Sequence, residues 1–153
     1  MIANQLTVAA RLAANFFLEA RMENPCAVRV LLVEDSLPVR QRIRSLIEEF
    51  GPVEIVGETG TVAGALALFH QHTPDAVVLD LNLADGDGCA VLTAIKRTCP
   101  ACVVMVLTNF VIPECRDLCL KLGADYFFNK SREFERVPAV LTQLRRRLNS
   151  RNA

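Results

Sequence analysis

Four short apolar runs in this chain each end on a polar residue. The runs cover residues 28–33, 76–79, 103–107 and 126–129, and they lead into Glu34-Asp35, Asp80, Thr108 and Lys130 respectively. Runs of this length, rich in β-branched residues, are typical of strands buried on both faces. If all four are parallel strands, the polar residues that follow them meet at one edge of the sheet.

Segments with helical periodicity separate the apolar runs. This alternation predicts βαβ units, and therefore a doubly wound α/β fold with helices on both faces of a parallel sheet. We expect five strands near residues 28–33, 53–57, 76–80, 103–107 and 125–128, and helices near 37–49, 61–71, 88–97, 113–122 and 133–148.

Residues that start and stop helices support these boundaries. Ser36 and Thr61 stand where a side chain caps the first and second helices, and Pro113 suits the first turn of the fourth. Gly51-Pro52 ends the first helix.

Composition agrees with one compact domain. Of the 153 residues 52% are hydrophobic, and the mean hydropathy is +0.28. The 17 basic and 17 acidic residues cancel, so overall charge does not favour a nucleic-acid surface or a polybasic membrane anchor. The six cysteines show no regular disulfide framework, and Arg11 and Glu19 interrupt the only long apolar stretch. We therefore expect a cytoplasmic protein.

The polar residues at the strand ends predict a site for a metal and a phosphoryl group. Ligands bind at the carboxyl ends of the strands in doubly wound sheets. Crowded there, Glu34, Asp35 and Asp80 offer the oxygen ligands that suit Mg²⁺. Lys130 adds a positive charge and Thr108 a hydroxyl donor, both useful around phosphoryl oxygens.

This ordered set of residues resembles the receiver domain of two-component response regulators, in its stand-alone form. The resemblance covers about residues 28–148, and it includes the run from Asp80 to Gly88 and the run from Gly123 to Lys130. It implies the flavodoxin-like strand order 2-1-3-4-5. It also implies that Asp80 is the phosphoacceptor, and that Asp35, Asp80 and the backbone carbonyl of Asn82 hold Mg²⁺ while Glu34 contacts it through water.

The resemblance also implies a mechanism. Asp80 takes a phosphoryl group from a phosphohistidine on a histidine kinase or histidine phosphotransfer protein, so the chain is a self-phosphorylating acceptor, open to autodephosphorylation, rather than a conventional enzyme. Thr108 then moves toward the new phosphoryl group, and Phe127 turns inward to fill the space. The surface of the fourth helix, fifth strand and fifth helix becomes the output face for a protein target, without direct DNA binding.

Three positions depart from the family pattern. Asn109 replaces a small residue after Thr108, while Ala84 and Ser131 stand where prolines are common. A larger Asn109 side chain narrows access to Asp80, which leaves open a degenerate receiver that acts as a constitutive protein-binding scaffold. A haloacid-dehalogenase-like phosphatase is disfavoured because Asn82 replaces its second aspartate.

Other reactive residues have simpler interpretations. Cys99 and Cys102 enter a strand at the edge opposite Asp80, unlike a thioredoxin-type pair, so ordinary buried cysteines are favoured over a redox site or a four-thiolate site with Cys115 and Cys119. His70 and His72 are expected at the surface. Arg145–Arg147 are expected at a helix C-terminus, where they complement the dipole.

Residues 1–24 lie outside the family resemblance. Their apolar residues, among them Phe16 and Phe17, fall on one helical face, so we expect an amphipathic helix separated from the domain by Asn24-Pro25. It either packs on its own domain or forms a homodimer. Residues 149–153 are expected to be a short tail, with no output domain in this chain.

Overall fold

A five-stranded parallel sheet forms the centre of the computed structural model, which describes residues 27–153. The strands are β1 (Val28–Val33), β2 (Val53–Thr59), β3 (Ala76–Leu79), β6 (Val103–Thr108) and β7 (Tyr126–Asn129), in the order β2-β1-β3-β6-β7. The helices are α2 (Leu37–Glu49), α3 (Val62–His72), α4 (Gly88–Thr98), α5 (Pro113–Lys121) and α6 (Arg136–Asn152). A small hairpin, β4 (Asn82–Leu83) and β5 (Gly86–Asp87), follows β3. The predicted fold and strand order are confirmed.

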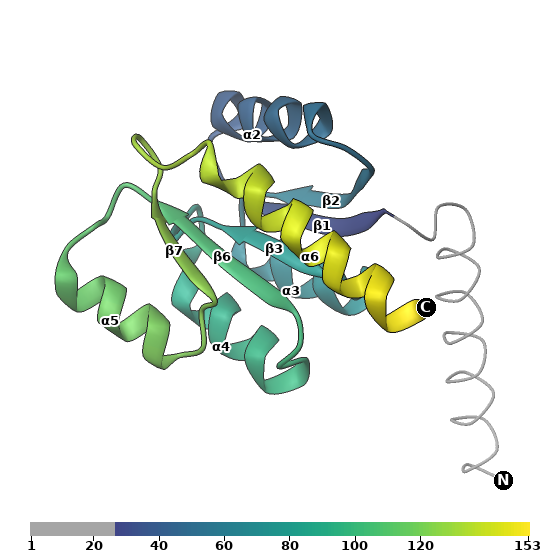
Figure 1. Ribbon diagram of the computed structural model, residues 1–153. Coiled ribbons are helices and arrows are strands. Elements are labelled where there is room, and N and C mark those ends of the chain that lie inside the picture. Colours follow the sequence, from purple (N-terminus) through teal and green to yellow (C-terminus); the bar gives the residue numbers. More distant parts are fainter. Residues whose placement is uncertain (1–26) are drawn as a thin grey trace, which may run out of the picture.

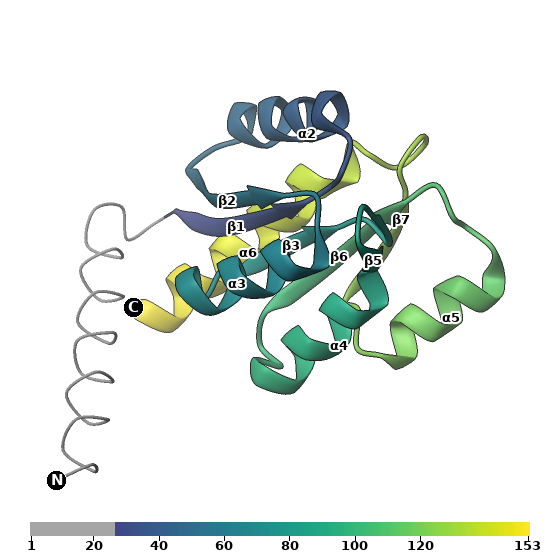
Figure 2. The same ribbon diagram turned by 180° about the vertical axis from the view of Figure 1, so that it is seen from behind.

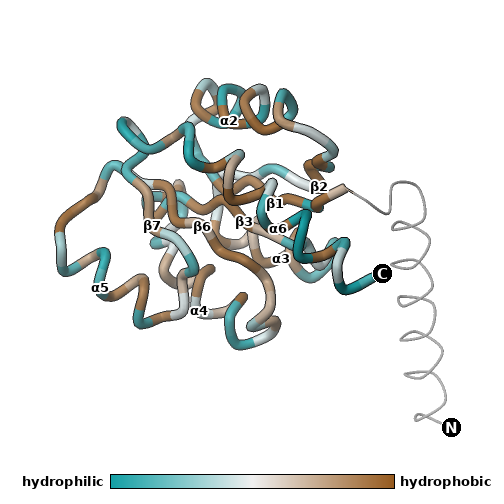
Figure 3. The backbone as a smooth tube through the Cα atoms, viewed as in Figure 1, coloured by the Kyte–Doolittle hydropathy of each residue, from teal (hydrophilic) through white to brown (hydrophobic). Residues whose placement is uncertain are grey.

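The helices form two layers around the sheet. Helices α2 and α6 cover one face (Figure 1), and α3, α4 and α5 cover the other (Figure 2). Each face has its own apolar core: Ile43 and Leu141 belong to the first, and Phe69 and Ile95 to the second. The hydropathy colouring shows the apolar sheet between helices of mixed character (Figure 3). Coverage on both faces explains why the strands read as continuous apolar runs rather than alternating ones.

The central strands are the most buried part of the molecule. Every residue of β1, β3 and β6 is buried, whereas the edge strand β2 is mostly half-buried. Burying one Leu or Val side chain contributes about 1.5–3 kcal/mol, so these strands form a firm platform. Residues placed directly after them are therefore held in well-defined positions.

Helix starts agree with the sequence in one case and differ in another. Thr61 caps α3, since its hydroxyl oxygen accepts a hydrogen bond from the Gly64 N–H at 2.9 Å. Ser36 occupies the N-cap position of α2 but its side chain makes no cap hydrogen bond, so that prediction was wrong in chemistry though not in position. The Ser36 backbone N–H instead donates to Glu34 Oε1 at 3.1 Å.

The last helix lies further along the chain than predicted. It runs from Arg136 to Asn152 rather than over 133–148, so most of the expected tail is helical and Arg145–Arg147 are not at its end. Pro138 gives the physical reason, because a proline without an N–H fits only the first turn of a helix. The residues before it form a turn in which the Asn129 N–H donates to the Glu133 carboxylate at 2.8 Å.

Two predictions concern parts or properties outside this architecture. The amphipathic helix and homodimer contact predicted for residues 1–24 lie outside the described residues. Among residues 27–153, no helix combines the length and apolar character needed to cross a membrane.

Candidate functional site

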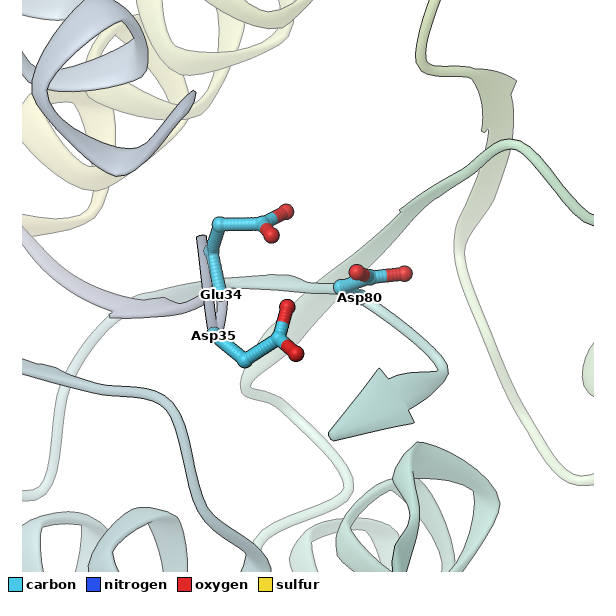
Figure 4. A group of neighbouring side chains, drawn as sticks. All are labelled: Glu34, Asp35 and Asp80. Atoms are coloured by element: carbon cyan, nitrogen blue, oxygen red, sulfur yellow. The ribbon is translucent and has the colours of Figure 1, made fainter. Parts of the chain in front are cut away.

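Three carboxylates meet at the carboxyl edge of the sheet. Glu34 and Asp35 follow β1 and Asp80 follows the neighbouring β3, whose last residue Leu79 pairs with Val33. The Asp80 backbone N–H donates to the Val33 carbonyl at 2.9 Å, which fixes the start of the segment between β3 and α4, residues 80–87, or the acceptor loop. One oxygen from each carboxylate lies within 4.8 Å of the others, and the Glu34 and Asp35 side chains extend from the end of β1 on the side where Asp80 lies (Figure 4). The predicted acidic cluster is confirmed.

Lys130 reaches this cluster from the end of β7. Its backbone N–H donates to the Thr108 carbonyl at 2.9 Å, which places the residue beside the end of β6. Its ammonium nitrogen Nζ lies 2.7 Å from Asp80 Oδ2 and 2.7 Å from Glu34 Oε2. The side chains of Lys130, Asp80 and Glu34 are 13%, 5% and 3% exposed, so these are largely buried ion pairs. The structure therefore confirms the prediction that the Lys130 side chain lies beside Asp80.

Burial and charge shift two pKa values at the site. Burial raises the pKa of Glu34, and the Lys130 ammonium and the Ser36 N–H offset only part of that effect. Burial acts to lower the pKa of Lys130, but its contacts with Asp80 and Glu34 outweigh burial and the net shift is upward. Lys130 therefore stays protonated at neutral pH, and one ammonium faces three carboxylates.

This charge imbalance fits a divalent cation. Glu34 Oε2 is buried and, despite its ion pair with Lys130, accepts no aligned hydrogen bond. Asp35 is exposed, so the cluster opens to solvent on that side. An all-oxygen, partly open set of ligands suits Mg²⁺. Asn82 lies beside Asp80, and its backbone N–H donates to Asp80 Oδ1 at 3.3 Å. The metal-binding role of the Asn82 carbonyl stays a prediction.

Thr108 and Phe127 occupy the neighbouring strands β6 and β7. Thr108 is 1% exposed, and its hydroxyl oxygen accepts a hydrogen bond from the Phe110 N–H at 3.2 Å. Phe127 was expected to turn inward when the protein is activated, but it is only 6% exposed and already belongs to the core beneath α3, α4 and α5. A switching role for Phe127 stays a prediction.

The three departures from the family pattern each have a structural counterpart. The Ser131 hydroxyl donates to Asn109 Oδ1 at 2.9 Å, which joins the loops after β6 and β7. The Ala84 N–H donates to the Gly60 carbonyl at 3.1 Å, a bond that a proline at this position could not make. None of the described peptide bonds is cis, so Lys130 and Ser131 are joined by a trans bond.

Two residues that the sequence interpretation missed also support the site. Arg40 donates from its guanidinium to the Glu34 carbonyl at 3.1 Å. The Asp85 carboxylate accepts hydrogen bonds from the N–H groups of Val62 and Ala63, and thereby ties the acceptor loop to the start of α3. These backbone hydrogen bonds lower the pKa of Asp85. A carboxylate just before a helix in the sequence indicates a helix cap. Asp85 gave no such signal for α3, because that helix lies far from Asp85 in the sequence.

Comparison with known proteins agrees with this geometry. Residues 30–142 match the model of the response regulator receiver domain family. The response regulator protein VraR of Staphylococcus aureus is 29% identical in an alignment that covers 81% of this chain and 66% of the relative. This chain thus spans slightly less than two thirds of that relative's length.

Solved structures show the same fold. The receiver domain of the response regulator NarL from Mycobacterium tuberculosis superposes with a TM-score of 0.70 at 26% identity, covering 78% of this chain and 97% of that one. A DNA-binding response regulator of the LuxR family from Staphylococcus aureus gives a TM-score of 0.71 at 24% identity, covering 77% and 98%. The second likeness is one of fold alone.

Proposed function

The chain belongs to the response regulator receiver domain family, and on that basis we propose that Asp80 accepts a phosphoryl group from a phosphohistidine. The donor would be a histidine kinase or a histidine phosphotransfer protein. One observation carries the proposal: the Lys130 ammonium lies 2.7 Å from Asp80 Oδ2, beside two further carboxylates. A nucleophilic carboxylate, a fixed positive charge and an oxygen-ligand cluster are the parts that phosphoryl transfer needs.

The proposed reaction is an in-line displacement. An Asp80 oxygen attacks the phosphorus atom, the bond from phosphorus to the imidazole nitrogen of the donor breaks, and the donor keeps that electron pair. Lys130 stays protonated, since its pKa is raised, and offsets the charge on the phosphoryl oxygens. Asp35, Asp80, Glu34 and the Asn82 carbonyl would hold Mg²⁺, which supplies further charge neutralisation when bound. The product is an aspartyl phosphate, and the chain acts as an acceptor rather than a conventional enzyme.

The proposed output is a change in protein contacts. Phosphorylation would replace the single negative charge of the Asp80 carboxylate with roughly −1.5 to −2 and add three acceptor oxygens, so the Thr108 hydroxyl gains a new partner beside it. Thr108 now holds Phe110 through one hydrogen bond, and Phe110, Val111 and Ile112 are exposed at 61%, 44% and 48%. A turn of the Thr108 side chain would release this apolar loop at the start of α5. We expect a protein target on the surface of α5, β7 and α6, without direct DNA contact there, and a cytoplasmic location.

A second candidate is a degenerate receiver that serves as a constitutive protein-binding scaffold. The observation in its favour is the hydrogen bond between Ser131 and Asn109, which joins the loops after β6 and β7 next to Lys130. If that bond blocks access to Asp80, the chemistry is slow or lost while the surface remains. Measuring phosphorylation directly separates the two candidates.

The deciding experiment uses a small phosphodonor, such as acetyl phosphate, with the full chain. With Mg²⁺ present, intact mass should show one added phosphoryl group, and chelation with EDTA should prevent it. The Asp80→Asn variant should gain none. Asp117→Asn, which removes an exposed carboxylate on α5, is the matched control and should react like the parent. A folded parent that gains no phosphoryl group would favour the scaffold, and equal labelling of Asp80→Asn would rule out Asp80 as the acceptor.

A further inference from the structure

Three cysteines come together between α4 and α5, on the sheet face opposite α2 and α6. Cys89 lies in the first turn of α4, while Cys115 and Cys119 lie one turn apart on α5. The Cys119 thiol is fully buried and interacts directly with the thiols of Cys89 and Cys115, which are both half-buried. Helix α5 thus meets α4 through sulfur atoms.

These thiols connect two segments that border the phosphorylation site. The start of α4 is packed tightly on the acceptor loop, because the Gly88 N–H donates to the Leu81 carbonyl at 2.8 Å. A Cβ atom on Gly88 would lie only 2.8 Å from the Leu81 Cα. Helix α5 follows the loop that begins directly after Thr108, the last residue of β6. A covalent bond between α4 and α5 would therefore join the acceptor loop to the segment after Thr108.

A metal site is not what this cluster offers. Within residues 27–153, only Glu34, Asp35 and Asp80 bring three ligand atoms within 4.8 Å of one another. The cysteine sulfurs instead form pairwise contacts, centred on Cys119. Cys115 and Cys119 share one helix, whereas Cys89 and Cys119 come from different helices, so the second pair can be joined without distorting a helical turn.

We propose that Cys89 and Cys119 form a disulfide under thiol-oxidising conditions and so cross-link α4 to α5. The bond needs the two sulfurs to approach to about 2.05 Å, so α5 must shift slightly toward α4. Helix α5 can do so, because Cys119 is its one fully buried side chain. This inference is independent of the proposed phosphoryl chemistry.

The oxidation balances with glutathione disulfide as the oxidant. The Cys89 thiolate attacks one sulfur of glutathione disulfide, which releases one glutathione that takes up the proton. The Cys119 thiolate then attacks the Cys89 sulfur and releases the second glutathione. Two protein thiols are oxidised and one glutathione disulfide is reduced. Burial raises the pKa of Cys89 and raises that of Cys119 to about 12, so the exchange is slow and requires sustained oxidation.

The test uses a variant in which the other three cysteines are changed, Cys26→Ser with Cys99→Ser and Cys102→Ser. It is incubated with glutathione disulfide, then denatured and alkylated without reduction. We expect one alkylated cysteine and a disulfide within one chain. Trypsin places Cys89, Cys115 and Cys119 in separate peptides, residues 45–96, 98–116 and 117–121, so the linked pair is read directly by mass spectrometry.

Matched variants decide the assignment. Cys115→Ser should keep the cross-link, whereas Cys89→Ser, Cys119→Ser and Cys119→Ala should each abolish it, with thermal melting to confirm that each variant is folded. The proposal is overturned if all three cysteines stay open to alkylation. A link that survives in folded Cys89→Ser, or one that joins two chains, would overturn it equally.

Discussion

Replacing Lys130 with methionine tests whether one ammonium holds the acidic cluster together. The substitution keeps the length of the side chain and removes the charge, which leaves Glu34 and Asp80 buried without a cation. At 2.7 Å each ion pair is worth about 6 kcal/mol before desolvation is counted, for an effective dielectric constant of about 20. Breaking a buried pair typically costs about 3–5 kcal/mol. Lys130 is 13% exposed, so we expect a loss of about 3 kcal/mol at pH 7 without Mg²⁺.

Thermal and urea unfolding, followed by circular dichroism in EDTA, measure this loss. For a chain of this size about 3 kcal/mol corresponds to a fall in Tm of roughly 6–12 °C. The matched control is Arg44→Met, because Arg44 also pairs with two carboxylates, Glu48 and Glu58, but at the surface with 39% exposure. Exposed pairs contribute little, so Arg44→Met should cost no more than about 1 kcal/mol.

The pH dependence gives the result that would refute this reasoning. Lys130 has a raised pKa, so in the parent its contribution is complete below 10.5 and is lost only as pH rises through the higher folded-state value. In Lys130→Met, Glu34 loses the contact that offsets the effect of burial on its pKa, so this carboxylate binds a proton more readily in the folded state. The deficit relative to the parent should therefore shrink from pH 7 to pH 5, and Mg²⁺ should reduce it at pH 7. Equal stability of variant and parent at pH 7 in EDTA, or a deficit independent of pH, would refute the idea.

Three further predictions concern the same edge of the sheet. Asp35→Asn should weaken Mg²⁺ binding about tenfold or more, measured by calorimetry, while stability in EDTA stays equal or rises, because the exposed carboxylate repels its neighbours. The affinity of the parent for Mg²⁺ should fall as pH drops through the raised pKa of Glu34, beginning above pH 4.5, because protons compete for that carboxylate. If the affinity did not change between pH 7 and pH 4.5, Glu34 would be excluded from the site. Gly88→Ala should cost about 1–3 kcal/mol in urea unfolding, because its Cβ meets the Leu81 backbone, whereas Gly86→Ala, which meets only a valine side chain, should change little.

The sheet and the main site residues were predictable because their signal is local. A strand buried on both faces reads as an apolar run, and a polar residue that ends such a run marks the carboxyl end of the strand. Parallel strands bring these ends to one edge, so Asp80 and Lys130 meet although 50 positions separate them. The apolar runs and the polar residues that end them are therefore enough to predict the fold, the acidic cluster and the position of Lys130.

The features that escaped prediction depend on tertiary contacts or on misjudged local signals. Asp85 caps a helix that begins 23 positions earlier in the chain, and Cys89 meets Cys119 across two helices. Neither pairing has a pattern along the sequence. The start of α6 was different, because Pro138 did carry the boundary. Ser36 was a misjudged local signal. Its backbone N–H donates to the Glu34 carboxylate, but its hydroxyl makes no hydrogen bond that caps α2.

The charge balance at Asp80 explains why one lysine can serve both the resting site and the proposed product. In the resting site Lys130 is shared between Asp80 and Glu34, and the excess negative charge favours a divalent cation. Phosphorylation of Asp80 would replace one negative charge with roughly −1.5 to −2, which draws Lys130 toward the phosphoryl oxygens and away from Glu34. Glu34 would then depend on the cation, or on a proton, for its balance. Mg²⁺ should therefore stabilise the phosphorylated protein more than it stabilises the unphosphorylated protein.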